Sequence, residues 1–350
     1  MEEAARIARK LSALAELGLE RVENHAVASD AVRIDRLTHK VTGGRPAMGT
    51  YVSISALARS RERAEEAIGR AFQEMDRLVK LLNRFDGASA VACLNQEGRL
   101  RGAPPEVATV IERSLHYHEL CAGTFDISVK PLIDLFQREL GGATPREPGR
   151  RELAEALELV GSRDVELAGG TIGFKKAGMG ITLDGIAKGY IVDRMAAVLS
   201  KHRVRDYLIN AGGDIRAAGT KEERRPWTVA VQDPAKGGNF PDVLHLRDAS
   251  VATSGSYEIY FDRERLFHHL VSSRTGRSPD LNTSVSIVAP SAMAADALAT
   301  SLFVMDSHEA VRFVESLPRC ECLIIDTDGC QRRSSGWKSA RHLNGYEGWS

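Results

Sequence analysis

The pattern of hydrophobic and polar residues divides the chain into short alternating runs and longer stretches with helical spacing. Between residues 51 and 56 the two kinds of residue alternate, which is typical of a strand buried on one face. From Ala64 to Leu82, apolar residues recur every three or four positions and predict a long amphipathic helix. By the same criteria, further helices are expected at about residues 104–115, 150–159, 185–199 and 292–305, and further strands at about 207–210, 227–231 and 284–289.

The order of these elements indicates an α+β fold. The strands come in clusters that are separated by Gly and Asp turns and backed by helices, whereas a parallel α/β sheet would need strand and helix to alternate regularly. We expect one α+β domain over residues 41–345, with a long exposed loop at the Pro- and Gly-rich stretch 141–149. A helical extension is expected over residues 1–40, because one helical face of its opening segment carries Ile7, Leu11, Leu14 and Ala15.

Composition and charge narrow the class of protein. The 350 residues include 47 Lys and Arg against 47 Asp and Glu, so no net field attracts nucleic acid or an anionic membrane, and we expect no nucleic-acid partner. With 43% hydrophobic and 27% charged residues, the chain has the composition of an ordinary globular protein. Disordered, collagenous and coiled-coil classes are thereby excluded.

Three features of the sequence bear on location. No run approaches the roughly 18 apolar residues of a membrane span, so no span is expected. The apolar stretch near residues 11–19 is interrupted by Glu16 and follows acidic residues, unlike a signal peptide. Five cysteines cannot all pair within one chain, which favours a reducing compartment. The sequence as given predicts a cytoplasmic protein, and an extracytoplasmic location would require a targeting segment that has been removed.

Two Gly-rich segments are candidates for binding. Asp184-Gly-Ile-Ala-Lys-Gly-Tyr190 begins a predicted helix, where main-chain N–H groups and the helix dipole favour an anion such as phosphate, and Lys188 adds a positive charge. The alternative is that Gly185 and Gly189 permit close packing while Lys188 reaches into solvent. The second segment, Asn-Ala-Gly-Gly-Asp at 210–214, follows a predicted strand and by itself predicts only a turn.

Asp296 and Thr300 are spaced by one helical turn, so their side chains share a face of a predicted helix. Their neighbours are almost all Ala, Leu and Met, and burying a carboxylate without a partner there would cost several kcal/mol. Mg²⁺ suits this pair because it takes oxygen ligands and is commonly held by one or two carboxylates together with substrate phosphates. Alternatively, Asp296 caps or hydrogen-bonds a neighbouring loop and the Thr300 hydroxyl bonds back to the preceding turn. Spacing alone leaves both interpretations open.

Histidine and cysteine residues in the second half of the chain are further candidates. His268 and His269 are adjacent in a predicted strand, so at most one of them faces a given site. An imidazole beside the basic Gly turn at 272–277 would serve as a general base, as a phosphate contact, or as a structural residue. We interpret three cysteines as core and surface thiols, because a C-x-C pair with one distant Cys lacks the ligands of a zinc site: Cys320, Cys322 and Cys330.

Eight segments, taken in order, resemble the ApbE family of flavin transferases. They span roughly residues 46–305, and although each alone is weak, the eight in this order are specific. The segments are MGTYVSI at 48–54, RFDGASAVACLN at 84–95, TFDISVKPL at 124–132, LDGIAKGYIVD at 183–193, LINAGGDIR at 208–216, VATSGSY at 251–257, HLVSSRTGR at 269–277 and AADALAT at 294–300.

The resemblance implies a fold, an activity and partners. It implies an ApbE-like, T-fold-related α+β architecture in which mixed or antiparallel sheets pack with helices and a cleft between lobes holds FAD. The implied reaction is Mg²⁺-dependent transfer of FMN from FAD to a Ser or Thr hydroxyl through a phosphodiester bond, with release of AMP. The protein partner would be an acceptor flavoprotein subunit that carries this Ser or Thr. Two alternatives are an FAD pyrophosphatase, which yields FMN and AMP, and an FAD-binding protein without chemistry.

Carried over residue by residue, the resemblance also implies a site. The Mg²⁺ ligands would be Asp296, Thr300 and the main-chain carbonyl of Gly185, with Asp296 serving catalysis through the metal. His269 would act as the base toward the acceptor hydroxyl. The FAD site would be lined by Met48, the Ala90-Val91-Ala92 turn, Asp126, Lys188 and His269. Where the family commonly has Asp-Pro, this chain has Ser272-Ser273, and we expect a less rigid loop there.

Overall fold

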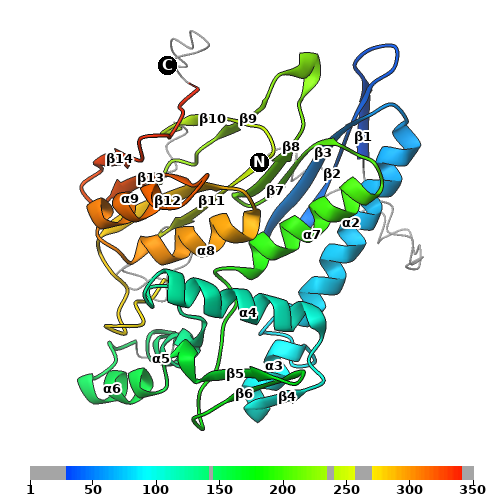
Figure 1. Cartoon of the computed structure of the whole chain (residues 1–350). Helices are drawn as coiled ribbons and strands as arrows, with labels where there is room; N and C mark the ends of the chain where they lie inside the picture. The colour runs from blue at the N-terminus through cyan, green and yellow to red at the C-terminus, as the bar shows by residue number, and fades with distance from the viewer. Residues whose placement is uncertain (1–28, 142–144, 235–239, 257–269, 341–350) are drawn as a thin grey trace.

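The computed structural model describes residues 29–141, 145–234, 240–256 and 270–340. Its centre is a sheet of nine strands in which every neighbouring pair is antiparallel (Figure 1). In order across the sheet, the strands are β1 (Ser29–Arg33), β2 (His39–Ala47), β3 (Thr50–Ala58), β7 (Asp206–Ala211), β8 (Asp214–Ala218), β11 (Ala249–Gly255), β12 (Asn282–Ala289), β13 (Glu321–Asp326) and β14 (Gln331–Arg333).

A layer of helices covers one face of this sheet (Figure 1). It consists of α2 (Arg61–Leu82), α7 (Ala187–Lys201), α8 (Ala292–Phe303) and α9 (Ser307–Glu315). The alternating residues of β3 explain the layer, because Val52, Ile54 and Ala56 are fully buried in the same core cluster as the apolar stripe of α2. Sheet and helices therefore share one hydrophobic core.

A smaller cluster covers the centre of the opposite face. The hairpin of β9 (Trp227–Ala230) and β10 (Val243–Leu246) packs there with residues of β8 and β11, including Ile215 and Val251. Trp337, in the segment after β14, belongs to the same cluster, and its indole N–H donates to the Asp242 carboxylate at 2.9 Å. This hydrogen bond attaches the segment after β14 to the hairpin.

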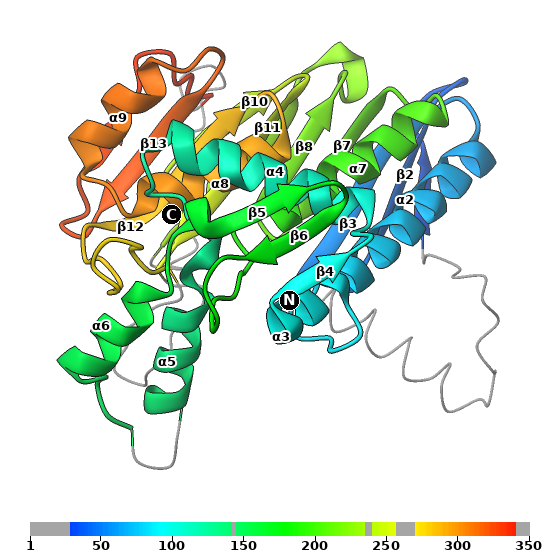
Figure 2. The same cartoon turned by 60° about the horizontal axis from the view of Figure 1, so that its bottom comes forward.

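A second group of elements lies below the helix layer (Figures 1 and 2). Its small sheet has the strand order β4-β6-β5, and α4 is the member of the group that lies next to α8 (Figure 1). The elements are α3 (Ala90–Glu97), β4 (Arg99–Arg101), α4 (Pro105–Leu120), η1 (Ile127–Val129), α5 (Lys130–Leu140), α6 (Arg150–Glu158), η2 (Ser162–Asp164), β5 (Val165–Ala168) and β6 (Thr171–Phe174). The last short element, η3 (Glu222–Arg224), follows β8.

The structure confirms the expected α+β class and the strands and helices predicted within the described residues, but it moves the expected domain boundary. The division at residue 40 falls inside β2, and residues 29–33 form a strand paired with it rather than part of a helical extension. Residues 29–33 become a strand because they pair with β2, and no local pattern in the sequence indicates this pairing. The helix expected around Leu11 lies outside the described residues. In the expected loop at 141–149, residues 145–149 contain no helix or strand.

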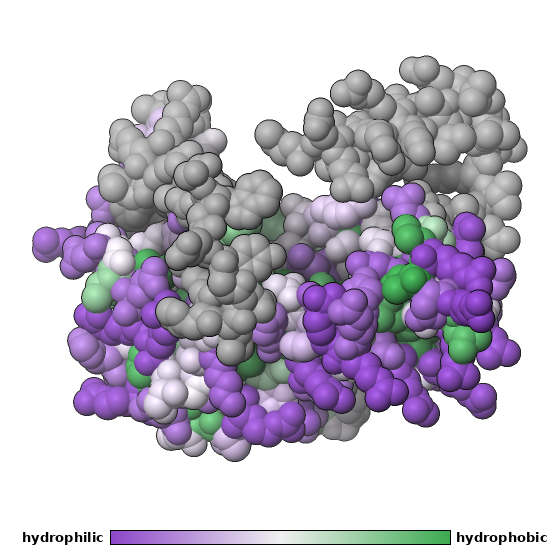
Figure 3. Space-filling model, turned by 90° about the horizontal axis from the view of Figure 1, so that it is seen from above, coloured by the Kyte–Doolittle hydropathy of each residue, from purple (hydrophilic) through white to green (hydrophobic). Residues whose placement is uncertain are grey.

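Where the view from above shows described residues, the hydrophobic ones form small separate patches (Figure 3). Among the helices that the structure describes, none combines the length and the hydrophobicity needed to cross a bilayer.

Candidate active site

The turn before α7 and the helix α8 meet at contacts that require glycine. A Cβ on Gly185 would lie 2.8 Å from the Thr300 hydroxyl oxygen, and a Cβ on Gly189 would lie 2.4 Å from the carbonyl oxygen of Ala292. The interpretation that both glycines permit close packing is therefore correct. The same contacts bring the main chain of Gly185 beside the Thr300 side chain.

Asp296 lies at the centre of this contact. Its side chain is buried, and one carboxylate oxygen accepts a hydrogen bond from the Gly189 main-chain N–H at 3.0 Å. One turn further along α8, the Thr300 hydroxyl lies 3.4 Å from that of Ser254 on β11. Asp296 thus does bond a neighbouring main chain, as the alternative interpretation held. A carboxylate has room for several donors, however, and one N–H leaves capacity for a cation.

Asp214, which the sequence analysis placed only in a turn, belongs to the site. Its carboxylate, 2% exposed, lies 3.6 Å from the ammonium of Lys188 and in hydrogen-bonding contact with Asp296. Burial and the negative charge of Asp214 raise the pKa of Asp296 well above its usual value, while Lys188 and the Gly189 N–H act in the opposite direction. With its pKa raised, Asp296 keeps a proton beside Asp214 when no cation is bound, and a divalent cation bound there would displace that proton and offset both carboxylate charges.

The donor set fits Mg²⁺. Carboxylate, hydroxyl and main-chain carbonyl oxygens are the ligands that this ion takes, and the neighbouring residues Asp296, Thr300 and Gly185 carry one of each kind. Across the described part of the chain, no three His, Cys, Asp or Glu side chains group into a metal centre. A cation here would therefore rely also on water and substrate oxygens, as Mg²⁺ usually does.

Lys188 points into the site rather than away from it. Its side chain is 30% exposed and pairs with Asp214. The interpretation that it reaches into solvent is therefore wrong, because the buried carboxylate attracts the ammonium. Lys188 stands in the first turn of α7, where the helix dipole also favours an anion, so a phosphate at this position would meet two positive features.

Met48 lies at the same end of the sheet. It occupies the tight turn between β2 and β3 with φ 52°, followed by Gly49 with φ 72°. Behind this turn, Gly212 approaches Thr50 so closely that a Cβ would lie 2.2 Å from the threonine hydroxyl. Because Gly212 immediately precedes the Gly213-Asp214 step, the structure brings the Met48 turn beside the segment that carries Asp214.

The 90–92 turn is the start of α3, and its side chains serve the core. The Ser89 hydroxyl caps the helix by accepting the Ala92 N–H at 3.0 Å, and Val91 and Ala92 are 0% and 4% exposed. Asn95 exchanges two hydrogen bonds with the main chain of Ile181, at 2.9 and 2.7 Å. This exchange attaches α3 to the segment that leads into Gly185, and a role of the 90–92 turn in FAD binding stays a prediction.

Asp126 is a buried anchor. Its carboxylate accepts hydrogen bonds from the hydroxyls of Ser128 and Ser162 and lies 3.2 Å from the imidazole of His118. Burial raises the pKa of Asp126, but the hydrogen bonds from His118, Ser128 and Ser162 outweigh it and hold the pKa below its usual value. A direct role of Asp126 in FAD binding stays a prediction.

His269 lies outside the described residues, so its role also stays a prediction. The loop that follows it is anchored by serines. The Ser273 hydroxyl donates to the carbonyl of Gly123 at 2.7 Å, and the Ser272 hydroxyl accepts the N–H groups of Arg274 and Thr275 at 3.3 and 3.4 Å. These hydroxyls supply hydrogen bonds to the turn, and the lower rigidity expected of this loop stays a prediction.

Two further residues at the edge of the site were missed by the sequence analysis. Arg84 pairs with Asp184 at 3.0 Å, and its guanidinium lies 4.1 Å from the centre of the Phe85 ring. Phe85 is 71% exposed, and its neighbour Arg84 is attached to Asp184, the residue before Gly185. The segment RFDG contains both residues, but no local pattern in the sequence indicates that Arg84 pairs with Asp184.

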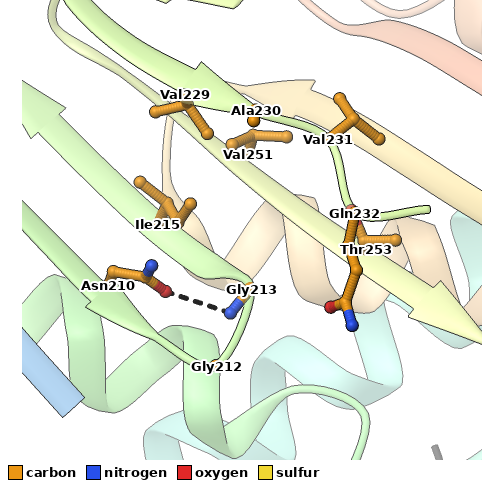
Figure 4. A pocket seen from close by; sticks show the side chains of 10 residues that line it. All are labelled: Asn210, Gly212, Gly213, Ile215, Val229, Ala230, Val231, Gln232, Val251 and Thr253. Atoms are coloured by element: carbon orange, nitrogen blue, oxygen red, sulfur yellow. Dashed lines mark hydrogen bonds between the residues drawn. The ribbon is translucent and has the colours of Figure 1, made fainter. Parts of the chain in front are cut away.

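Two hollows lie near the ends of these elements. One, of about 130 Å³, lies between β9 and the turn at Gly212 and Gly213, and Thr253 lines it (Figure 4). The other, of about 670 Å³, is lined by His202 and Arg203, which follow the C-terminus of α7. Neither hollow is lined by Asp296, Thr300 or Lys188. The candidate site therefore consists of the residues in contact between α7, α8 and β8.

Comparisons with known proteins agree with the resemblance. The sequence model of the ApbE family matches residues 48–324. An FAD:protein FMN transferase of Treponema pallidum is 32% identical over 286 residues, which cover 75% of this chain and 77% of the relative. One from Haemophilus influenzae is 26% identical over 320 residues, or 87% and 91% of the two chains.

Solved structures give the same result for the fold. The ApbE protein of Thermotoga maritima superposes with a TM-score of 0.76 at 31% identity, covering 85% of this chain and 97% of that one. The flavin transferase ApbE of Vibrio cholerae superposes with a TM-score of 0.71 at 24% identity, covering 88% and 98%, and at this identity it supports the fold alone. The expected ApbE-like architecture is confirmed.

Proposed function

The chain belongs to the ApbE family, and we propose that it is an FAD:protein FMN transferase. In the proposed reaction it moves FMN from FAD to a Ser or Thr hydroxyl of a flavoprotein, with Mg²⁺ bound, and releases AMP. The observation that carries the proposal is the convergence of Asp214, Asp296 and Lys188 beside Thr300 and the Gly185 main chain. The curated relatives cited above carry the name of this activity.

The chemistry requires charge stabilisation more than covalent catalysis. The acceptor oxygen would form a bond to the phosphorus of the FMN half, and the bond from that phosphorus to the bridging oxygen would break. AMP would leave with the bridging oxygen, and the hydroxyl proton would pass to a base. Negative charge develops on the leaving phosphate and on the transferred phosphoryl oxygens, so fixed positive groups lower the barrier.

In this proposal, each described residue has a defined task. Gly185, Asp296 and Thr300 hold Mg²⁺, which when bound neutralises charge on the phosphates. Asp214 orients the ammonium of Lys188 toward the start of α7, where it attracts the FAD phosphates. The FAD cleft is proposed between the helix layer and the lower group of elements, with Met48, Ala90, Val91, Ala92 and Asp126 on its walls.

The base is proposed to be His269, which would take the proton of the acceptor hydroxyl. Water at the acceptor position would attack the same phosphorus and give free FMN and AMP. Transferase and pyrophosphatase activities would therefore use the same site and differ in the nucleophile that reaches it. An FAD-binding protein without chemistry would not need a bound metal, so the proposed metal ligands Asp296 and Thr300 argue against that alternative.

Intact mass measurement tests the proposal. The chain is incubated with FAD, MgCl₂ and a flavoprotein subunit that carries the acceptor hydroxyl, and AMP is quantified in parallel. We expect the acceptor to gain one FMN joined as a phosphodiester, with an equal amount of AMP, and an acceptor with Ala at the modified position to stay unlabelled. Free FMN and AMP without labelling would favour the pyrophosphatase, and unchanged FAD would contradict both activities.

A further inference from the structure

The carboxylate of Asp193 joins α7 to the first turn of α8. Its two oxygens accept hydrogen bonds from the main-chain N–H groups of Ala292 and Met293, each at 2.9 Å. The following N–H group, of Ala294, donates to the hydroxyl of the N-cap residue Ser291 at 3.1 Å. The first N–H groups of any helix lack partners within that helix. In α8, two of them are satisfied by a residue of α7.

Three contacts at intervals of one turn connect the two helices. The residues on α7 and its preceding turn are spaced by four positions, and so are their partners on α8, which run in the opposite direction. The contacts are Gly185 with Thr300, Gly189 with Asp296 and Asp193 with Ala292. Contacts at three successive turns determine both the rotation of α8 about its axis and its position along α7. The metal ligands belong to the first two contacts, and Asp193 makes the third.

Arg216 holds the start of α8 from a third element. It follows Asp214 by two positions in β8, so both side chains point to the same face of the sheet. Its guanidinium donates to the Ser250 hydroxyl at 3.2 Å and to the carbonyl oxygen of Pro290, two residues before α8 begins. The beginning of α8 is thus held from both α7 and β8.

We propose that Asp193 is a positioning residue for the metal site and acts by keeping α8 where Asp296 and Thr300 face Gly185. This inference rests on the proposed function, to which the metal site belongs. Mg²⁺ demands near-ideal octahedral geometry, so a small rotation or slide of α8 would misplace its oxygens. Residues that orient metal ligands are therefore expected to influence affinity without touching the ion.

Direct metal titration tests the role of Asp193. Free Mn²⁺ is followed by electron paramagnetic resonance at pH 7, without FAD, for the wild type, Asp193→Asn and Asp193→Glu. Asparagine presents an amide NH₂ to one of the two N–H donors, so one link is lost. We expect the Kd for Mn²⁺ to rise about tenfold or more in Asp193→Asn, and less in Asp193→Glu, which keeps the carboxylate. In turnover, kcat should fall while KM for FAD changes little.

A matched control separates positioning from stability. Asp306 caps α9 through the N–H groups of His308 and Glu309, at 2.9 and 3.2 Å, and α9 carries none of the proposed ligands. Asp306→Ala removes this cap, so it should lower the melting temperature and leave the Kd for Mn²⁺ unchanged. If Asp193→Asn behaves in the same way, Asp193 is only a cap and the positioning role is overturned, while the proposed function stands.

Two further outcomes are decisive. A wild type that binds no Mn²⁺ would remove the metal site, and the positioning role would fall together with that part of the proposed function. Where Asp193→Asn does not fold, Asp193→Glu carries the test, because it retains the charge and shifts the carboxylate by one methylene. A Kd for Mn²⁺ in Asp193→Glu equal to that of the wild type would overturn the positioning role.

Discussion

Replacing Gly189 with Ala should destabilise the protein, although this change inside a helix normally stabilises it. Ala is favoured over Gly in a helix interior by about 1 kcal/mol, because Gly loses more backbone entropy on folding. At this position, however, the added Cβ would lie 2.4 and 2.7 Å from the carbonyl oxygen and carbon of Ala292 and 2.8 Å from the Cα of Met293. All three are main-chain atoms, so α7 and α8 must move apart.

The size of the effect follows from opposing contributions. Forcing a methyl group into a packed contact costs about 1–3 kcal/mol. Separating the helices also lengthens the hydrogen bond from the Gly189 N–H to Asp296, a loss of about 1 kcal/mol. After subtraction of the gain in helix propensity, about 1 kcal/mol, the free energy of unfolding should fall by about 1–3 kcal/mol.

Urea unfolding followed by circular dichroism, at pH 7 with chelator present, measures this difference. The control is Gly69→Ala in α2, where an added Cβ meets nothing within 4 Å. That variant should gain up to about 1 kcal/mol from helix propensity. The same Gly→Ala change should therefore raise the free energy of unfolding at residue 69 and lower it at residue 189. Unfolding free energies for Gly189→Ala that match or exceed those of the wild type would refute the packing argument.

Three more predictions concern charge and pH. Asp296→Asn should raise the Mg²⁺ concentration for half-maximal AMP release more than Thr300→Val does, because it removes a full charge rather than a neutral ligand. A wild-type Mg²⁺ dependence in Asp296→Asn would exclude Asp296 as a ligand. EDTA should abolish AMP release and excess Mg²⁺ restore it, whereas full activity in chelator would argue against a metal. The hydrogen bond to Asp126 raises the pKa of His118 above its ordinary 6.5. The stabilisation that protonated His118 provides is therefore complete below pH 6.5 and is lost as the pH rises through the pKa of the folded state. His118→Gln should therefore cost more unfolding free energy at pH 5.5 than at pH 9, and an equal cost at both would disprove the linkage.

Periodic burial made much of the fold predictable. Val52, Ile54 and Ala56 face a core while their neighbours do not, and this one-sided burial produces the alternation that predicted β3. The strand β2 gave no such signal, because Gly43, Gly44 and Pro46 are unfavourable in strands. It becomes a strand by pairing with β3 along its whole length, which is a tertiary effect that overrides local preference.

The site was predictable only where it is local in sequence. The four-residue spacing of Asp296 and Thr300 and the position of Lys188 near the start of a helix can be recognised from the chain alone. The contact of Asp214 with Asp296 cannot, because it depends on β8 lying beneath α8 in the folded sheet. The close approach of Gly189 to Ala292 is equally non-local, since a glycine in a helical stretch does not indicate which main chain will pass beside it.

The central claim is that Gly185, Asp296 and Thr300 hold a divalent cation together. Anomalous scattering from crystals grown with Mn²⁺ in place of Mg²⁺ tests it most directly. The account predicts one anomalous peak about 2 Å from an Asp296 carboxylate oxygen, the Thr300 hydroxyl and the Gly185 carbonyl, and no peak there in Asp296→Asn. A peak elsewhere, or a wild-type site that stays empty at saturating Mn²⁺, would contradict it.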